Sequence, residues 1–166
     1  MVTLLEPSPG GLNMQILARR RVLVVDDNAH ARAFLAQILG AVGVDVLQAD
    51  SGPKALVMLG AMQVDAVFVD MFMQPMDGIQ LTRAIRASGQ AQIARLPIIM
   101  ASAQASREVV HGGVVAGVTA FLAKPFSAEG ALKRLVGALQ PAPVEITQPA
   151  PEPAAEDPAS RDAAYL

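Results

Sequence analysis

The sequence contains no cysteine and no tryptophan, and only 17% of its 166 residues are charged. Without cysteine the chain has no disulfide, no thiolate metal site and no cysteine nucleophile. A formal net charge of −2 gives no basic field for nucleic-acid phosphates, which disfavours a protein that coats DNA or RNA. No uninterrupted apolar run approaches the roughly 18 residues of a membrane helix, and the first 11 residues lack the cationic start of a secretory signal. We therefore expect a soluble, cytoplasmic protein.

Short apolar runs rich in valine and isoleucine alternate with longer segments of helical period from Arg21 onward. Parallel strands need helical crossovers, so this alternation predicts an α/β fold of the (βα)₅ type. In such a fold a doubly wound, five-stranded parallel sheet carries helices on both faces. The predicted strands are 21–25, 44–48, 66–69, 98–101 and 119–122.

Five helices are predicted between and after these strands from their caps and apolar faces. The first covers 29–39, and its periodicity places Phe34 on the inward face. The fourth, 107–115, contains the pair Gly112-Gly113, and each glycine costs about 1 kcal/mol of helix stability relative to alanine. Ser51, Asp77 and Ser127 are the expected N-caps of the second, third and fifth helices.

The two ends of the chain differ in composition from the middle. Residues 1–19 include Pro-Ser-Pro-Gly-Gly and predict a flexible lead with a short ordered piece around Met14 to Leu17. Residues 141–166 carry six prolines among alanine and acidic residues, and their little apolar surface cannot offset the entropy of ordering. We expect a domain at 20–140 and a disordered tail, which is too short for a DNA-binding domain because folded domains usually begin near 50 residues.

Three carboxylates end two of the predicted strands. Asp26 and Asp27 follow the first strand, and Asp70 follows the third. The carboxyl ends of parallel strands meet at one edge of a sheet, where ligands bind, so we expect these acids to lie together. Like charges that close repel unless a cation lies between them, and oxygen ligands suit Mg²⁺. An N-cap role at the first helix would explain only one of the paired acids.

Two further polar residues end the remaining strands of this edge. Ser102 follows the fourth strand and Lys124 follows the fifth. A carboxylate attacks a phosphoryl group only when a metal, a cation or hydroxyl donors neutralise the charge on the transferring oxygens. Acids, a hydroxyl and a lysine on separate loops therefore favour phosphoryl transfer to an aspartate.

Four segments in this order resemble the receiver domain of two-component response regulators, the CheY-like family. Each segment alone is weak evidence, but all four follow predicted strands and together form a strong signature over residues 21–139. The segments are Val24-Val25-Asp26-Asp27-Asn28, then Val69-Asp70 with Met76-Asp77-Gly78, then Ala101-Ser102-Ala103, and finally Ala116 through Lys124-Pro125-Phe126.

The resemblance implies a role for each site residue. Asp70 would be the phosphoacceptor, taking a phosphoryl group from a sensor histidine kinase or a histidine phosphotransfer protein. Asp27 would ligate Mg²⁺ directly and Asp26 mainly through water, and the backbone carbonyl of Phe72 would add a ligand. Lys124 would contact a phosphoryl oxygen.

The resemblance also implies a switch. Ser102 would swing toward the phosphoryl group, and the aromatic ring of Phe121 would change its burial as Ser102 moves. The Lys124-Pro125 bond would be cis. A downstream protein would bind the face formed by the fourth helix, fifth strand and fifth helix, without direct contact to nucleic acid and without membrane insertion.

Three positions depart from the family pattern. The proline that usually follows the phosphoacceptor by four residues is displaced by one, to Pro75. Phe72 replaces a polar residue that often orients the attacking water, so we expect slow hydrolysis of the phosphorylated state. Phe121 lacks the hydroxyl of a tyrosine and would signal by packing alone.

We interpret the chain as a stand-alone receiver, a signalling switch rather than an enzyme, which assists its own phosphorylation and dephosphorylation. A phosphate sink and a phosphorylation-independent interaction module remain open. A haloacid dehalogenase-like phosphatase, which also uses an aspartate nucleophile, normally has an acid where Phe72 stands. A nucleotide-binding module is disfavoured because no glycine-rich phosphate loop follows any strand.

Overall fold

A computed structural model, which describes residues 14–104 and 106–140, contains the parallel sheet that the sequence predicts. The five strands pair in parallel in the order β2-β1-β3-β4-β5. The strand order reverses between β1 and β3, so the carboxyl ends of these two strands flank the crevice in which such sheets bind ligands. The strands are β1 (Arg21–Val25), β2 (Asp45–Ala49), β3 (Ala66–Asp70), β4 (Ile98–Ser102) and β5 (Ala120–Ala123).

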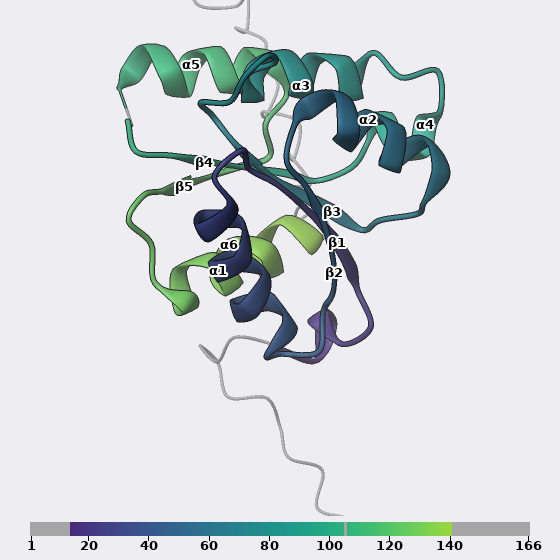
Figure 1. Ribbon diagram of the computed structural model, residues 1–166, viewed down its shortest axis with the longest axis vertical. Coiled ribbons are helices and arrows are strands. Elements are labelled where there is room, and N and C mark those ends of the chain that lie inside the picture. Colours follow the sequence, from purple (N-terminus) through teal and green to yellow (C-terminus); the bar gives the residue numbers. More distant parts are fainter. Residues whose placement is uncertain (1–13, 105, 141–166) are drawn as a thin grey trace, which may run out of the picture.

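Helices cover both faces of the sheet, which makes the fold a doubly wound (βα)₅ architecture (Figure 1). On one face lie α1 (Ala29–Gly40) and α6 (Ala128–Leu139). On the other lie α2 (Gly52–Ala61), α3 (Gly78–Arg86) and α5 (Arg107–Ala116). Two short elements complete the described part of the chain: the 3₁₀ helix η1 (Met14–Leu17) and the single turn α4 (Ala91–Ala94).

Each face of the sheet has its own apolar core, because successive strand residues point to opposite sides. In β1, Val22 and Val24 pack beneath α1 and α6, whereas Leu23 and Val25 pack beneath α2 and α3. The strands β1, β3 and β4 are therefore buried on both sides, apart from the first residue of β1.

The N-terminal 3₁₀ helix confirms the short ordered piece expected before the first strand. Leu17, at its end, is fully buried in the core beneath α1 and α6. The lead before residue 14 and the tail at 141–166 lie outside the described residues, so their disorder stays a prediction. Among the described residues, no helix combines the length and the apolar character needed to cross a bilayer.

Several sequence-based boundaries are shifted by one residue. The second and fifth strands begin at Asp45 and Ala120, one residue later than expected. The third and fourth strands run one residue longer, to Asp70 and Ser102, because Asp70 still pairs with Ala101 in the β3–β4 ladder. The turn α4 has only four residues, too few for a periodic pattern.

Phe34 is not on the inward face of the first helix, as the periodicity predicted. Its side chain is 51% exposed, and its ring lies against Phe126 with 6.0 Å between ring centroids. Leu35 and Leu39, one turn apart, fill the buried positions of α1 instead. The apolar stripe is therefore narrower than predicted, and Phe34 lies at its margin.

Candidate functional site

The three predicted acids lie together at the carboxyl edge of the sheet. Carboxylate oxygens of Asp26, Asp27 and Asp70 all lie within 4.8 Å of one another. Asp26 and Asp27 follow β1 directly, and Asp70 ends the adjacent strand β3. Asp26 and Asp70 are buried, whereas Asp27 is exposed. Strand pairing therefore joins acids that are more than 40 residues apart in the chain.

The turn after β1 leaves the acids available because another residue caps α1. Asn28 is the N-cap, and its side-chain oxygen accepts hydrogen bonds from the backbone N–H groups of His30 and Ala31, both at 3.0 Å. The alternative that Asp26 or Asp27 caps this helix is therefore wrong. One carboxylate oxygen of Asp26 accepts from the N–H of Asn28 at 2.9 Å.

Arg32 also holds this turn, a contact that the sequence did not indicate. Its guanidinium donates to the backbone carbonyl oxygen of Asp26 over 2.6 Å. This bond fixes the backbone at the end of β1 from one turn inside α1. This arginine belongs to no sequence motif, so its contact with the end of β1 is visible only in the structure.

Lys124 bridges two of the acids. Its ammonium nitrogen Nζ lies 2.6 Å from Oδ1 of Asp70 and 3.1 Å from Oδ2 of Asp26. The backbone N–H of Lys124 donates to the carbonyl of Ser102 at 2.8 Å, which ties the end of β5 to the end of β4. The Lys124-Pro125 bond is cis, as expected, and the Gln74-Pro75 bond is cis as well.

Burial and the hydrogen bonds between Lys124 and the acids shift the pKa values of Asp70 and Lys124 in opposite directions. Burial raises the pKa of Asp70, and the nearby Asp26 and Asp27 raise it further, against the hydrogen bond from Lys124. Burial alone would lower the pKa of Lys124, but hydrogen bonds to Asp70 and Asp26 outweigh it and raise that pKa. When Asp26, Asp27, Asp70 and Lys124 are all ionised, the three carboxylates and the one ammonium have a net charge of −2. This oxygen-donor set fits a hard divalent cation such as Mg²⁺.

Ser102 lies at the same edge, but its hydroxyl is turned to its own loop. Oγ donates to the carbonyl oxygen of Gln104 at 2.7 Å and accepts from the Gln104 N–H at 3.1 Å. Phe121 is partly buried. In the β4–β5 ladder Ser102 pairs with Ala123, and Phe121 stands two residues before Ala123. Ser102 and Phe121 therefore lie on the same face of the sheet, as neighbours along a diagonal.

The loop after β3 carries Phe72, whose side chain is 50% exposed. The loop leads to α3, where Asp77 and Gln80 form a capping box with hydrogen bonds of 2.7 and 3.0 Å. The predicted N-cap role of Asp77 is thus confirmed. Ser127 also caps its helix, accepting from the N–H of Gly130 at 3.0 Å, whereas Ser51 makes no side-chain cap bond.

Gly78 has a packing role that the sequence analysis missed. A Cβ atom on Gly78 would lie 2.5 Å from the backbone carbonyl oxygen of Asp70 and 3.0 Å from Cα of Met71. No side chain fits at such a distance from backbone atoms, so only glycine lets α3 begin against the end of β3. The signal was present in the Met-Asp-Gly segment of the family pattern.

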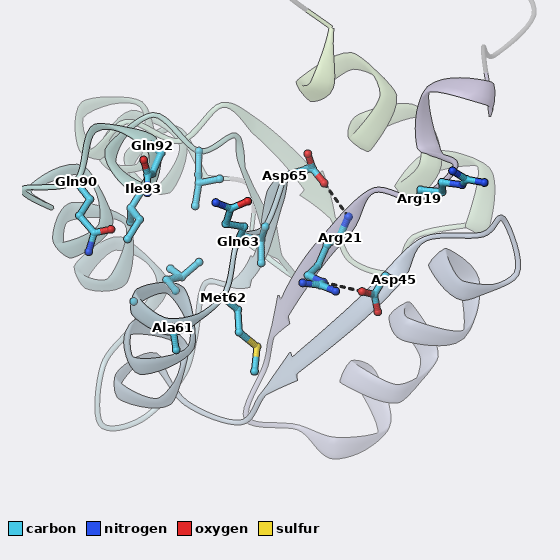
Figure 2. Close-up of a pocket in the computed structure, with 14 residues that line it drawn as sticks. Arg19, Arg21, Asp45, Ala61, Met62, Gln63, Asp65, Gln90, Gln92 and Ile93 are labelled. Carbon is cyan, nitrogen blue, oxygen red and sulfur yellow. Dashed lines mark hydrogen bonds and ion pairs between the residues drawn. The ribbon is translucent and has the colours of Figure 1, made fainter.

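A cavity lies at the opposite edge of the sheet, near the amino ends of the strands (Figure 2). This cavity of about 640 Å³ is bordered by Arg21, Asp45 and Asp65 and by side chains of α2 and α4. Arg21 pairs with Asp45 at 2.6 Å, and Asp65 pairs with Arg20 at 2.9 Å. Because both carboxylates already have cationic partners, this cavity lacks the uncompensated negative charge of the edge with Asp70.

A doubly wound parallel sheet with an acid cluster, a lysine and a hydroxyl at its carboxyl edge defines the class of phosphorelay receivers. The family model for the response regulator receiver domain matches residues 22–136. The chain therefore belongs to the receiver family of two-component response regulators.

Two curated relatives illustrate this membership. The chain is 34% identical over 110 residues to the chemotaxis protein CheY of Pseudomonas aeruginosa, a match that covers 66% of this chain and 87% of CheY. It is also 34% identical over 141 residues to the response regulator MprA of Mycobacterium tuberculosis, covering 85% of this chain and 56% of MprA. The chain thus spans little more than half the length of MprA.

Solved structures share the same fold. The chemotaxis response regulator CheY4 of Vibrio cholerae superposes with a TM-score of 0.69 at 32% identity, covering 74% of this chain and all of that chain. A response regulator receiver protein from Pseudomonas putida superposes with a TM-score of 0.66 at 36% identity, covering 71% and 96%.

Family membership settles the coarse function. Receiver domains are signalling switches of two-component phosphorelays, pair with histidine kinases or phosphotransfer proteins, and bind Mg²⁺ at an acidic cluster. The haloacid dehalogenase-like phosphatase is therefore set aside.

Proposed function

We propose that this receiver accepts a phosphoryl group on Asp70 from a phosphohistidine of a kinase or phosphotransfer protein and assists that transfer itself. In the reaction the P–N bond to the histidine breaks, and a carboxylate oxygen of Asp70 forms the new P–O bond. The observation that carries the proposal is the bridge from Lys124 to Asp70 and Asp26. This bridge supports the proposal because the Lys124 ammonium would neutralise charge that develops on the incoming phosphoryl oxygens as Asp70 attacks.

The acid cluster supports a metal role in this reaction. Asp26, Asp27, Asp70 and the backbone carbonyl of Phe72 would hold Mg²⁺, which supplies charge neutralisation for an incoming phosphoryl group when it is bound. The three carboxylates carry more negative charge than Lys124 can balance, so the cluster stays strained by repulsion until a cation binds.

Phosphorylation would change the surroundings of Asp70 because it adds about −1.5 to −2 charge units at neutral pH. Ser102 would exchange its two bonds with Gln104 for a phosphoryl oxygen, and Phe121 would follow on the same face of the sheet. The change would reach the surface formed by α5, β5 and α6. On α5, Val114 and Val115 are 59% and 66% exposed, which supports a protein-binding role for this surface.

We infer further that the receiver domain at 20–140 works as a cytoplasmic switch. A receiver that drains phosphate or serves only as an interaction module would have the same fold. An assay of downstream signalling, rather than of the phosphorylation site, would distinguish these roles.

Intact-protein mass spectrometry tests the central claim. The chain is incubated with Mg²⁺ and acetyl phosphate, a small phosphodonor, beside the variants Asp70→Ala and Asp65→Ala. Asp65 is a matched control because it is an ion-paired aspartate at the opposite edge of the sheet. We expect the mass to rise by one phosphoryl group in the wild type and in Asp65→Ala, and not in Asp70→Ala. Labelling of Asp70→Ala to the wild-type extent would refute the assignment.

A further inference from the structure

The ring of Phe121 lies where a side chain of residue 113 would be. A Cβ atom on Gly113 would overlap Cζ of Phe121 and would lie 2.8 Å from its Cε1. The next group, Cγ2 of Val118, is at an ordinary contact distance of 3.5 Å. Gly113 therefore leaves a slot on the inner side of α5, defined by Gly113 and Val118, and the tip of the Phe121 ring fills it.

The neighbouring glycine has no such role. A Cβ atom on Gly112 would meet only Cδ1 of Ile79 on α3, at 3.1 Å. This atom is the far end of a flexible side chain and can move by a few tenths of an ångström. The sequence singled out the two glycines as a pair, but the structure separates them, because only Gly113 contacts an aromatic ring.

The helix cannot readily withdraw from the ring at this point. The carbonyl of Gly113 accepts hydrogen bonds from the N–H groups of Gly117 and Val118, at 3.0 and 2.9 Å, which close the end of α5. Gly117 adopts the left-handed conformation with φ of 98°. Its carbonyl accepts from Nε and Nη2 of Arg86, at 3.0 and 2.7 Å. A side chain added at residue 113 would therefore displace the ring rather than the helix.

The slot lies on the face of the sheet that also carries Ser102. The β4–β5 register makes Phe121 and Ser102 diagonal neighbours on that face. With the ring in the slot, the Ser102 hydroxyl is bonded to Gln104 and not to the acids. Because Ser102 is its diagonal neighbour, a ring driven out of the slot keeps apolar surface from water by moving along this face toward Ser102. A ring in that position would crowd the Ser102 hydroxyl and disfavour its hydrogen bonds to Gln104.

We propose that Gly113 is a positioning residue of the switch: its missing side chain holds Phe121 in the slot and thereby favours the state in which Ser102 is withdrawn. This inference rests on the proposed function, because it takes the Ser102 hydroxyl to contact the phosphoryl group. Filling the slot shifts the resting equilibrium toward the phosphoryl-binding state. The ligand for that state then binds more tightly, as linkage between the two sites requires.

The matched variants Gly113→Ala and Gly112→Ala test the proposal, since each adds one methyl group and gains about the same helix propensity. The chain contains five phenylalanines, so fluorophenylalanine labelling gives five ¹⁹F resonances, and Phe121→Leu assigns that of Phe121. Beryllium fluoride with Mg²⁺ serves as the phosphoryl analogue. We expect Gly113→Ala to move the Phe121 resonance of the ligand-free protein toward its position in the beryllium fluoride-bound wild type.

The same variant should bind beryllium fluoride about fivefold more tightly than wild type, at the low end of couplings between sites. Gly112→Ala should leave both the resonance and the affinity unchanged. In a Phe121→Ala background, Gly113→Ala should no longer change the affinity. Equal effects of the two alanine variants, or a gain that persists without Phe121, would overturn the proposal.

The proposed function can fail separately from this inference. If wild type with Mg²⁺ shows no binding of beryllium fluoride and no phosphorylation on Asp70, the proposed function is wrong. The Phe121 resonance of ligand-free Gly113→Ala still decides whether the slot positions the ring. A resonance that does not move relative to Gly112→Ala refutes the slot itself.

Discussion

Arg86 binds the carbonyl of Gly117 through two guanidinium nitrogens, Nε at 3.0 Å and Nη2 at 2.7 Å. Its third nitrogen, Nη1, donates to the carbonyls of Ala94 and Leu96, at 2.9 and 2.8 Å. One side chain at the end of α3 thus satisfies three backbone carbonyls: one just after α5, one at the end of α4 and one between α4 and β4. Burial lowers the pKa of Arg86 from its ordinary value, but an arginine keeps its charge at neutral pH.

We therefore expect Arg86→Lys to lower the free energy of unfolding by about 2 kcal/mol, because an ammonium cannot reach the three carbonyls at once and leaves buried acceptors unpaired. Urea denaturation followed by circular dichroism measures the change. Arg83→Lys is the matched control, since Arg83 is exposed one turn earlier on the same helix and should shift the midpoint little. Equal midpoints for the two variants would show that the Arg86 bonds add no stability.

Gly78→Ala tests the close approach of α3 to the end of β3. The added methyl group would lie 2.5 Å from the carbonyl oxygen of Asp70, so the loop that carries Phe72 must move. We expect a loss of about 2 kcal/mol in unfolding free energy, in the range of overpacked cores, and weaker Mg²⁺ binding by calorimetry. Gly137→Ala in α6 meets open space and should gain up to about 1 kcal/mol instead. A stable Gly78→Ala protein with unchanged Mg²⁺ affinity would contradict this account.

The sequence was sufficient to predict the sheet and the position of the acids, because both follow from local patterns and from the geometry of parallel strands. Strand alternation and helical period are local signals, and parallel strands must bring their carboxyl ends to one edge. That rule places Asp26, Asp27 and Asp70 together without coordinates. It also placed Lys124 at the same edge, because that residue follows a strand in the same sheet.

The rest depends on contacts between elements, which local patterns do not encode. Phe34 has the spacing of a core residue, yet Leu35 and Leu39 fill the space beneath α1. Similarly, the sequence places Ser102 at the edge of the sheet, but the resting hydrogen bonds of its hydroxyl to Gln104, two residues away, are visible only in the structure. The difference between Gly112 and Gly113 is visible only once Ile79 and Phe121 are packed against them.

Lys124→Met removes the cation between Asp70 and Asp26. Three carboxylates then repel without compensation, and we expect the Mg²⁺-free protein to lose about 1 to 2 kcal/mol of stability, discounted for the partial exposure of Lys124. The same change should tighten Mg²⁺ binding, because the ion no longer competes with an ammonium. Thermal melts with and without Mg²⁺ measure both effects.

The pKa of Lys124 determines how the stability difference between wild type and Lys124→Met should change with pH. The pKa of Lys124 is raised in the folded state, so its stabilising contribution is fully present below the unfolded pKa of about 10.4. That contribution is lost as the pH rises through the higher folded value. The difference in stability between wild type and Lys124→Met should therefore stay constant from pH 7 to pH 10 and shrink above. A difference that shrinks below pH 9 would contradict the pairing.

Asp70→Asn should stabilise the Mg²⁺-free protein at neutral pH, because burial and the neighbouring acids raise the pKa of Asp70 and disfavour its charge. As the pH falls through the raised folded value toward the unfolded pKa of about 3.9, the folded wild type takes up the proton first. Its stability relative to Asp70→Asn then rises. Chemical denaturation at several pH values should show the gap between the two proteins closing in this window.

Magnesium supplies the control for the Asp70 prediction. With saturating Mg²⁺ the wild type gains binding energy that Asp70→Asn largely lacks, so the order of stability should reverse at neutral pH. If Mg²⁺ stabilises both proteins equally, Asp70 does not take part in holding the ion.

Phe72→Ser tests the expectation of slow hydrolysis. The Phe72 side chain stands two residues after the phosphoacceptor and is half exposed, so an attacking water must pass an apolar ring that cannot orient it by hydrogen bonds. A serine removes the ring and supplies a hydroxyl, and we expect phosphorylated protein to decay about tenfold faster, within the range that one positioned polar group contributes. Decay is followed by intact mass after the phosphodonor is removed. Phe34→Ser is the matched control, because Phe34 is a similarly exposed phenylalanine on α1, and its decay should equal that of wild type. Wild-type decay that is already as fast as that of Phe72→Ser would show that Phe72 does not shield the phosphoryl group.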